Sequence, residues 1–116
     1  MMIEVLKSKI HGARVTECDL EYEGSLGIPE DIISACGMYV NERIDIYNVT
    51  NGERFSTYVI KAPKGAGTFL VNGAAAHLCK KGDKIIIASY AHIDEKDIGQ
   101  HKPKIVRLDP ENKIVL

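Results

Sequence analysis

The pair Asn51-Gly52 most constrains how this chain folds, because it joins two runs of alternating apolar and polar residues, 43–50 and 53–60. An Asn-Gly pair between such runs is the strongest short-range signal for a two-residue type I′ turn, and such a turn fixes the register of the two strands. Thr50 is then expected opposite Glu53, and Ile46 opposite Thr57. The sequence therefore predicts a β-hairpin in the middle of the chain.

The predicted hairpin has one apolar and one polar face, because successive side chains of a strand point to opposite sides. The apolar face holds Ile44, Ile46, Phe55 and Val59, with Asn48 and Thr57 set into it. The polar face holds Asp45, Tyr47, Val49, Arg54, Ser56 and Tyr58. We therefore expect the first face to join a core and the second to meet solvent or a ligand.

Strand-like spacing of apolar residues continues through much of the chain. It predicts strands at 5–11 and 14–22 with a turn at Gly12, a buried strand at 84–88, and a tail hairpin of 105–108 and 113–116. Pro29 followed by two acidic residues predicts a short helix that Gly37 ends, and a second short helix is expected at 74–80. Many strands with two short helices favour a small closed β-barrel.

Size and charge limit the class of protein. A chain of 116 residues forms a single domain with a modest core, and such a chain gains stability from oligomerisation. Its net charge of −1, with both signs interspersed, argues against a nucleic-acid partner. No apolar run suits a signal peptide or a membrane span, so we expect a cytoplasmic protein. The cysteine and histidine spacings predict neither disulfides nor a metal site.

The dipeptide Gly24-Ser25, which follows the acidic run 17–23, has the residues needed for a reaction of the chain with itself. A serine hydroxyl can attack the carbonyl of a preceding glycine, which has no Cβ to block the approach. Elimination and hydrolysis of the resulting ester would leave a pyruvoyl group at residue 25. Taken alone, the pair is most simply a plain turn.

Other residues favour an anionic substrate. Arg54 can grip a carboxylate with two hydrogen bonds, and Tyr58 on the same strand face can donate a proton. Lys7 or Lys9, which alternate on one strand face, would supply a second positive charge near the Gly24-Ser25 turn. Asn72 precedes small residues that expose backbone N–H groups. Each also has an ordinary structural explanation: an exposed strand face, a solvated lysine, a tightly packed helix start.

Together these segments resemble the aspartate 1-decarboxylase family, the pyruvoyl-dependent bacterial enzymes that make β-alanine for pantothenate. The resemblance runs in order through residues 9–11, 19–25, 44–58, 71–77, 82–83 and 85–89. It fades after Ile93, and nothing is carried over there.

The resemblance implies a mainly β fold, a closed six-stranded double-psi β-barrel with two or three short helices. It implies a homotetramer with active sites between subunits. It also implies self-cleavage of a zymogen, one domain of residues 1–116, into a β chain of residues 1–24 and an α chain of residues 25–116. An accessory protein for maturation is a further candidate partner.

The resemblance also assigns roles. Gly24, Ser25 and Thr57 would serve self-processing, and the pyruvoyl group derived from Ser25 would be the cofactor. Its ketone would form a Schiff base with L-aspartate and accept electrons as CO2 leaves. Tyr58 would donate the proton. The substrate-binding residues would be Lys9, Arg54, Thr57, Asn72, Gly73, Ala74 and Ala75, with Tyr22 nearby.

Two other classes compete with this hypothesis. A self-cleaving hydrolase would keep the freed amine of Ser25 as the general base for its own hydroxyl. A small β-barrel regulatory or nucleic-acid-binding module would have no enzymatic activity, and fold alone does not exclude it.

Overall fold

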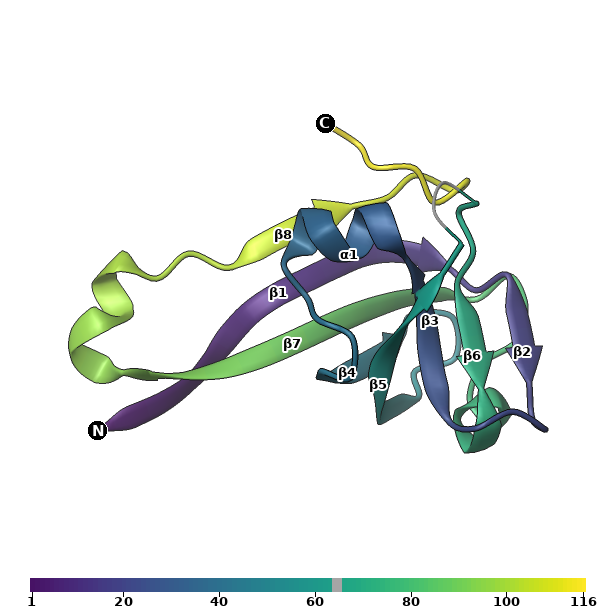
Figure 1. The fold of residues 1–116 in the computed structure, drawn as a ribbon, viewed down its shortest axis with the longest axis horizontal. Helices are drawn as coiled ribbons and strands as arrows, with labels where there is room; N and C mark the ends of the chain where they lie inside the picture. The colour runs from purple at the N-terminus through teal and green to yellow at the C-terminus, as the bar shows by residue number, and fades with distance from the viewer. Residues whose placement is uncertain (64–65) are drawn as a thin grey trace.

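The computed structural model describes residues 1–63 and 66–116, and the protein is mainly β with a few short helices (Figure 1). The strands are β1 (Met2–Arg14), β2 (Glu17–Asp19), β3 (Ser25–Pro29), β4 (Arg43–Asn48), β5 (Arg54–Ala62), β6 (Leu70–Asn72), β7 (Lys84–Asp94) and β8 (Lys104–Arg107). The helices are α1 (Glu30–Cys36) and the 3₁₀ helices η1 (Gly73–His77) and η2 (Glu95–Gln100).

The strands pair in the order β2-β6-β3-β5-β4-β7-β1-β8. In Figure 1, β1 and β7 run side by side as a long ribbon that extends away from the body holding β2, β3 and β6. Most pairs are antiparallel, but β3 pairs with β5, β2 with β6, and β1 with β8 in parallel. Over the residues that the structure describes, this is an eight-stranded order open at both ends, so a closed six-stranded barrel stays a prediction.

The central hairpin is confirmed, but the predicted register is wrong by two residues. Ile46 lies opposite Phe55, and Ile44 lies opposite Thr57. The loop is longer than two residues because the Asn48 side chain accepts hydrogen bonds from the backbone N–H groups of Thr50 and Asn51, so the turn starts at Asn48. A slip of two residues keeps every side chain on its predicted face.

The predicted turn at Gly12 is also wrong. β1 continues past Gly12, which has a φ of +90° and sits at a register shift in the pairing with β7. The extra residue forms a bulge instead of ending the strand. The predicted strand at 14–22 is shorter than expected: β2 spans only Glu17–Asp19, and the Asp19 carboxylate then accepts a hydrogen bond from the Glu21 N–H in a turn.

The helix after Pro29 is confirmed as α1, with Glu30 and Asp31 in its first turn and Gly37 at its end in the left-handed conformation. The second predicted helix is shorter than expected and of the 3₁₀ type, η1. The buried strand at 84–88 is confirmed as the start of β7, although Ile86 is only half-buried. In the tail, the predicted hairpin reduces to β8 and a single bridge between Leu108 and Ile114.

The core lies between the sheet and α1. Its largest fully buried side chains are Phe69, Ile10, Leu26, Ile28, Ile32, Ile44, Ile46, Ile85 and Ile87. Ile44 and Ile46 lie on the predicted apolar face of the hairpin, so the prediction that this face joins the core is confirmed. Aliphatic side chains dominate because the chain contains no tryptophan and only two phenylalanines.

Candidate active site

The candidate processing site is the start of β3, where Ser25 lies between β5 and β6. Ser25 is 3% exposed and pairs with Asn72 of β6. Asn72 Nδ2 donates a hydrogen bond to Ser25 Oγ at 3.4 Å, and Ser25 Oγ donates to the Glu23 carbonyl oxygen at 3.4 Å. Both contacts are long, so the hydroxyl is held near the chain that precedes it without being locked in place.

Gly73 packs directly against Gly24. A Cβ at Gly73 would lie 2.6 Å from Gly24 Cα, 2.6 Å from Gly24 N and 2.9 Å from the Tyr22 carbonyl oxygen. Gly73 also has a φ of +71°, which side chains rarely adopt. Only glycine fits here, because the backbone of β6 and η1 touches the Gly24-Ser25 segment. Ala74 and Ala75 follow in η1, one exposed and one half-buried.

The parallel pairing of β3 with β5 puts Thr57 and Tyr58 on the strand next to the one that Ser25 begins. β3 runs parallel to β5, with Leu26 beside Val59. Continuing this register toward the N-terminus sets Ser25 beside Tyr58 and Gly24 beside Thr57. Thr57 is half-buried on the core side and Tyr58 is exposed on the other. The structure thus brings Gly24, Ser25, Asn72 and Gly73 together, with Thr57 and Tyr58 on opposite faces of the adjacent strand β5.

Arg54 lies on the same strand face as Tyr58 but at the far end of β5. Four residues of strand separate their Cα atoms by about 13 Å. The Arg54 guanidinium stacks 4.6 Å above the ring of Tyr47, its partner across the hairpin. The sequence analysis missed Tyr47 because the wrong register placed it opposite Ser56.

Lys9 lies on the same outer face of the sheet as Arg54, but far from it. Lys9 pairs with Ala88, Ala88 with Asp45, and Asp45 with Ser56. Three strand spacings, about 14 Å, therefore separate Lys9 from β5 within one chain. A single chain does not bring Lys9 and Arg54 together at Ser25.

The outer face of the sheet is electropositive around Lys9. Burial lowers the pKa of His11, and the nearby cations Lys9, Lys84 and Arg107 lower it further. His11 is thus kept neutral at pH 7, because a further charge would be repelled by its neighbours. A face of this kind attracts anions.

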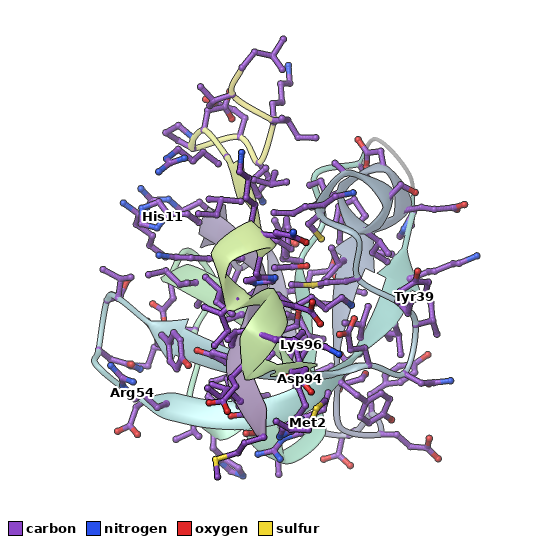
Figure 2. All side chains as sticks on the ribbon, turned by 90° about the vertical axis from the view of Figure 1, so that its left-hand side faces the viewer. Met2, His11, Tyr39, Arg54, Asp94 and Lys96 are labelled. Carbon is purple, nitrogen blue, oxygen red and sulfur yellow. The ribbon has the colours of Figure 1, made fainter. Side chains whose placement is uncertain are left out.

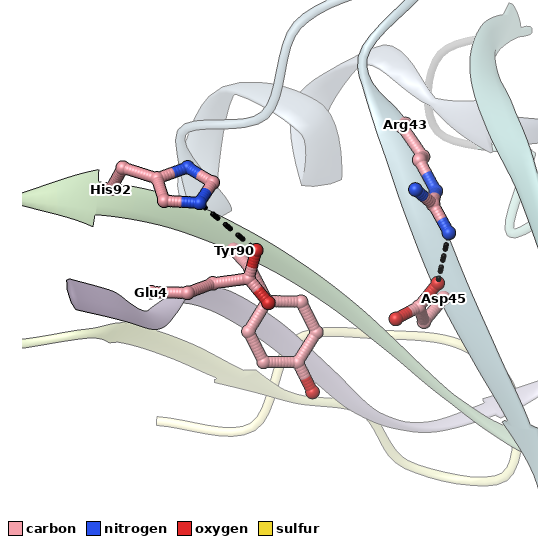
Figure 3. Close-up of a pocket in the computed structure, with 5 residues that line it drawn as sticks. All are labelled: Glu4, Arg43, Asp45, Tyr90 and His92. Carbon is pink, nitrogen blue, oxygen red and sulfur yellow. Dashed lines mark ion pairs between the residues drawn. The ribbon is translucent and has the colours of Figure 1, made fainter. Parts of the chain in front are cut away.

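The cavity drawn in Figure 3 lies elsewhere on this face, where β1, β4 and β7 meet. It is lined by Glu4, Arg43, Asp45, Tyr90 and His92. His92 Nε2 lies 3.4 Å from the Glu4 carboxylate, and Arg43 lies 4.0 Å from Asp45. None of the predicted site residues lines it, so we do not take it for the active site.

A small β-rich domain that holds a serine hydroxyl against its own preceding backbone suits the class of small amino-acid lyases. Comparison with known sequences supports that class. The aspartate decarboxylase family model matches residues 1–115, and the chain belongs to the aspartate decarboxylase family.

Individual relatives agree over almost the whole chain. The aspartate 1-decarboxylase of Caldicellulosiruptor bescii is 56% identical over 115 residues, which cover 99% of this chain and 90% of the relative. That of Leptothrix cholodnii is 50% identical over 114 residues, covering 98% and 87%. That of Maricaulis maris is 46% identical over 115 residues, covering 99% and 95%. The resemblance noted from the motifs is confirmed, and it also extends past Ile93.

These relationships favour the decarboxylase hypothesis over a regulatory module or a self-cleaving hydrolase. In the described part of the chain, no helix has both the length and the apolar character that crossing a membrane requires.

Proposed function

We propose that this chain cleaves itself between Gly24 and Ser25 and then decarboxylates L-aspartate to β-alanine and CO2. The close packing of Gly73 against Gly24, with Asn72 on the Ser25 hydroxyl, is the observation that carries the proposal. This packing supports a reaction in which the Ser25 hydroxyl is the nucleophile and the Asn72 amide is a hydrogen-bond donor. Membership of the aspartate decarboxylase family supports the substrate.

In the proposed self-processing, Ser25 Oγ attacks the carbonyl carbon of Gly24, and the peptide C–N bond breaks to give an ester and a free amine. Loss of the Ser25 Cα proton then breaks the Cβ–Oγ bond and releases residues 1–24 with a Gly24 carboxylate. Hydrolysis of the remaining enamine expels ammonia. Thr57, on the neighbouring strand β5, would polarise the carbonyl under attack.

The residues around Ser25 suit the pyruvoyl group that this sequence of steps would leave. The site is buried, the Asn72 amide reaches it, and the Gly24–Gly73 contact keeps side chains out of it. A pyruvoyl group supplies an electron sink for the electrons that remain when the substrate's α-carboxylate leaves as CO2. Asn72, Gly73, Ala74 and Ala75 would hold the group and the bound substrate.

Substrate recognition falls to the outer face of the sheet. Arg54 would bind a substrate carboxylate, Lys9 would add a second cation, and Tyr58 would deliver a proton to the substrate's Cα. Lys9 and Arg54 are far apart within one chain, so we propose that the site is completed between subunits of a homotetramer. Arg54 and Tyr58 are both exposed, which leaves them accessible to a neighbouring subunit.

Three further features belong to the same proposal. The parallel pairs β3–β5 and β1–β8 within a mostly antiparallel sheet support crossed connections of the double-psi kind. Three free cysteines support a cytoplasmic location, where thiols stay reduced. An accessory protein would affect the rate of cleavage, because the hydrogen bonds of the Ser25 hydroxyl are long and hold it loosely.

The proposal is tested by intact mass under denaturing conditions, followed by a β-alanine assay. We expect two chains divided after Gly24, with the larger lighter than residues 25–116 by one ammonia. Ser25→Ala should remain a single chain without activity, whereas Ser34→Ala, on the exposed side of α1, should cleave normally. An active and uncleaved Ser25→Ala protein would refute the mechanism.

The variant Tyr58→Phe distinguishes self-cleavage from decarboxylation. It removes only the phenolic hydroxyl, so cleavage should proceed while decarboxylation slows by about 10²-fold or more. Normal turnover by a fully cleaved Tyr58→Phe protein would remove Tyr58 from the role of proton donor.

A further inference from the structure

Two tyrosines that the proposed reaction does not use adjoin Arg54. The Tyr47 ring lies 4.6 Å from the Arg54 guanidinium carbon, and Tyr47 Oη lies 2.6 Å from Tyr90 Oη. Tyr47 comes from β4 and Tyr90 from β7, so three strands contribute to one contact chain. In Figure 3 the Tyr90 hydroxyl points away from His92 and the ion pair that His92 makes.

A short hydrogen bond between the two hydroxyl groups joins Tyr47 to the neighbouring strand β7, and either oxygen can be the donor. The hydrogen bond with Tyr47, and then burial, raise the pKa of Tyr90 to about 12. This bond restrains the Tyr47 ring, because a change of its χ1 rotamer would break a short contact with a neighbouring strand.

A guanidinium that lies over an aromatic ring can keep its N–H edge free for other partners. Ring stacking uses the flat face of arginine, while its N–H donors lie in the plane and point outward. In the described part of the chain, Asp45 forms an ion pair with Arg43 but none is found with Arg54. An exposed arginine without such support would sample many rotamers, and ordering it would weaken substrate binding.

We propose that Tyr47 and Tyr90 are positioning residues, which hold the Arg54 guanidinium by its face so that its edge is preset for a substrate carboxylate. The inference rests on the proposed function, in which Arg54 binds that carboxylate. Neither tyrosine touches the substrate in this scheme. Tyr47 acts through Arg54, and Tyr90 acts through Tyr47.

Steady-state kinetics with aspartate test the proposal. Tyr47→Leu removes the stacking surface and should raise KM about fivefold with kcat changed less than about twofold, the size of a partly exposed cation–π contact. Tyr47→Phe restores the ring and should recover most of the affinity. Tyr90→Phe removes only the hydrogen bond and should raise KM about twofold. In an Arg54→Ala background, none of these changes should alter KM further.

The chain offers a matched control in Tyr39. Lys7 Nζ lies 4.9 Å from the centre of the Tyr39 ring, which is a second cation–π contact. Figure 2 shows Tyr39 and Arg54 on opposite sides of the molecule. Tyr39→Leu should therefore leave KM unchanged. An equal rise in KM for Tyr39→Leu, or an unchanged KM for Tyr47→Leu with only a lower melting temperature, overturns the proposal.

A second measurement needs no activity. In 15N-arginine-labelled protein, the Arg54 Nε–Hε signal, assigned with Arg54→Lys, should be shifted by the ring current of Tyr47. We expect Tyr47→Leu to abolish the shift, Tyr90→Phe to reduce it, and Tyr39→Leu to leave it unchanged. If these shifts occur but Arg54→Ala leaves KM unchanged, the carboxylate role of Arg54 fails and not the positioning. If Tyr47→Leu does not move the signal, the positioning itself is overturned.

Discussion

At the scale of single residues, Gly73 has the least freedom to change. Its left-handed φ and its contact with Gly24 both exclude a side chain, whereas a Cβ at Gly24 would approach nothing closer than the Asn72 carbonyl oxygen at 3.9 Å. The two positions of the candidate site therefore require glycine for different reasons. Gly73 is required by packing, and Gly24 matters through the chemistry of its carbonyl.

We accordingly expect Gly73→Ala to lower the free energy of unfolding by about 2–4 kcal/mol, from the strained φ and the displaced Gly24 backbone. It should also slow self-cleavage, because it moves the carbonyl under attack. Urea unfolding and intact mass measure the two effects. Gly24→Ala is the control and should cost about 1 kcal/mol or less in stability; equal losses at both positions would contradict the packing argument.

Cys79 gives the protein a pH dependence of stability. Burial raises the pKa of its thiol from 9.0 to about 12, with nearby Cys18 and Asp83 adding to the rise. Between these values the folded chain keeps a proton that the unfolded chain has lost. The free energy of unfolding should then fall as pH rises above 9, by about 1.4 kcal/mol per pH unit from this group. Tyr90 adds to the fall above pH 10, because its pKa is also raised to about 12.

Urea unfolding between pH 8 and 11 checks this dependence. Cys79→Ala should reduce the slope between pH 9 and 10, where Tyr90 does not yet contribute, while the raised pKa values of Cys18 and Cys36 preserve part of it. An identical slope in the parent and in Cys79→Ala would show that the thiol ionises equally in both states.

At the scale of elements, the β4–β5 hairpin depends on Asn48 more than on Asn51-Gly52. Asn48 is buried; its Nδ2 donates to the Asp83 carboxylate at 2.9 Å and to the Leu78 carbonyl, and its Oδ1 accepts from the turn backbone. It thus ties the hairpin to the segment that leads into β7. Gly52, with a φ of +80°, ends the turn that Asn48 begins.

We expect Asn48→Ala to cost about 2–4 kcal/mol, because it leaves the buried Asp83 carboxylate short of a donor. Asn51→Ala removes an exposed hydrogen bond to the Leu78 carbonyl and should cost about 0.5–1 kcal/mol. Thermal and urea unfolding of the two variants measure the difference. A larger loss of stability for Asn51→Ala than for Asn48→Ala would show that the dipeptide Asn51-Gly52 determines the turn.

At the scale of the whole molecule, the tail is joined to the body through Asn112. The side chain is buried, donates to the carbonyls of Arg14 and Gly67, and accepts a hydrogen bond from the Arg14 N–H at 2.7 Å. Three chain segments far apart in sequence thus meet at one amide. In the sequence, Asn112 lies just before the second predicted strand of the tail hairpin, 113–116.

Asn112→Ala should therefore lower the free energy of unfolding by about 2–3 kcal/mol, since it leaves buried backbone groups unpaired. Amide exchange should accelerate in β8 and near Arg14, while the start of β3 stays protected. Lys113→Ala, at an exposed neighbouring position, is the control and should change neither stability nor exchange. Uniformly faster exchange throughout the chain would mean that the tail has no local role.

Local sequence determined much of this protein. The alternation of residues 43–60 fixed which side chains face the core, and Gly37 ended α1, because these outcomes depend on the period of a strand and on backbone freedom at a single glycine. The family could be recognised from short motifs in order. Gly24, Ser25, Asn72 and Gly73, which the structure brings together, were all named from the sequence.

The tertiary structure decided the rest. Side-chain hydrogen bonds of Asn48 to distant Asp83 and Leu78 hold the hairpin turn against the segment before β7, and the bulge at Gly12 depended on pairing with β7. The stacking of Arg54 on Tyr47, the bond between Tyr47 and Tyr90 and the burial of Asn112 join separate strands or segments. Contacts between residues far apart in sequence depend on how the strands are ordered in space, and no local pattern of residues specifies that order.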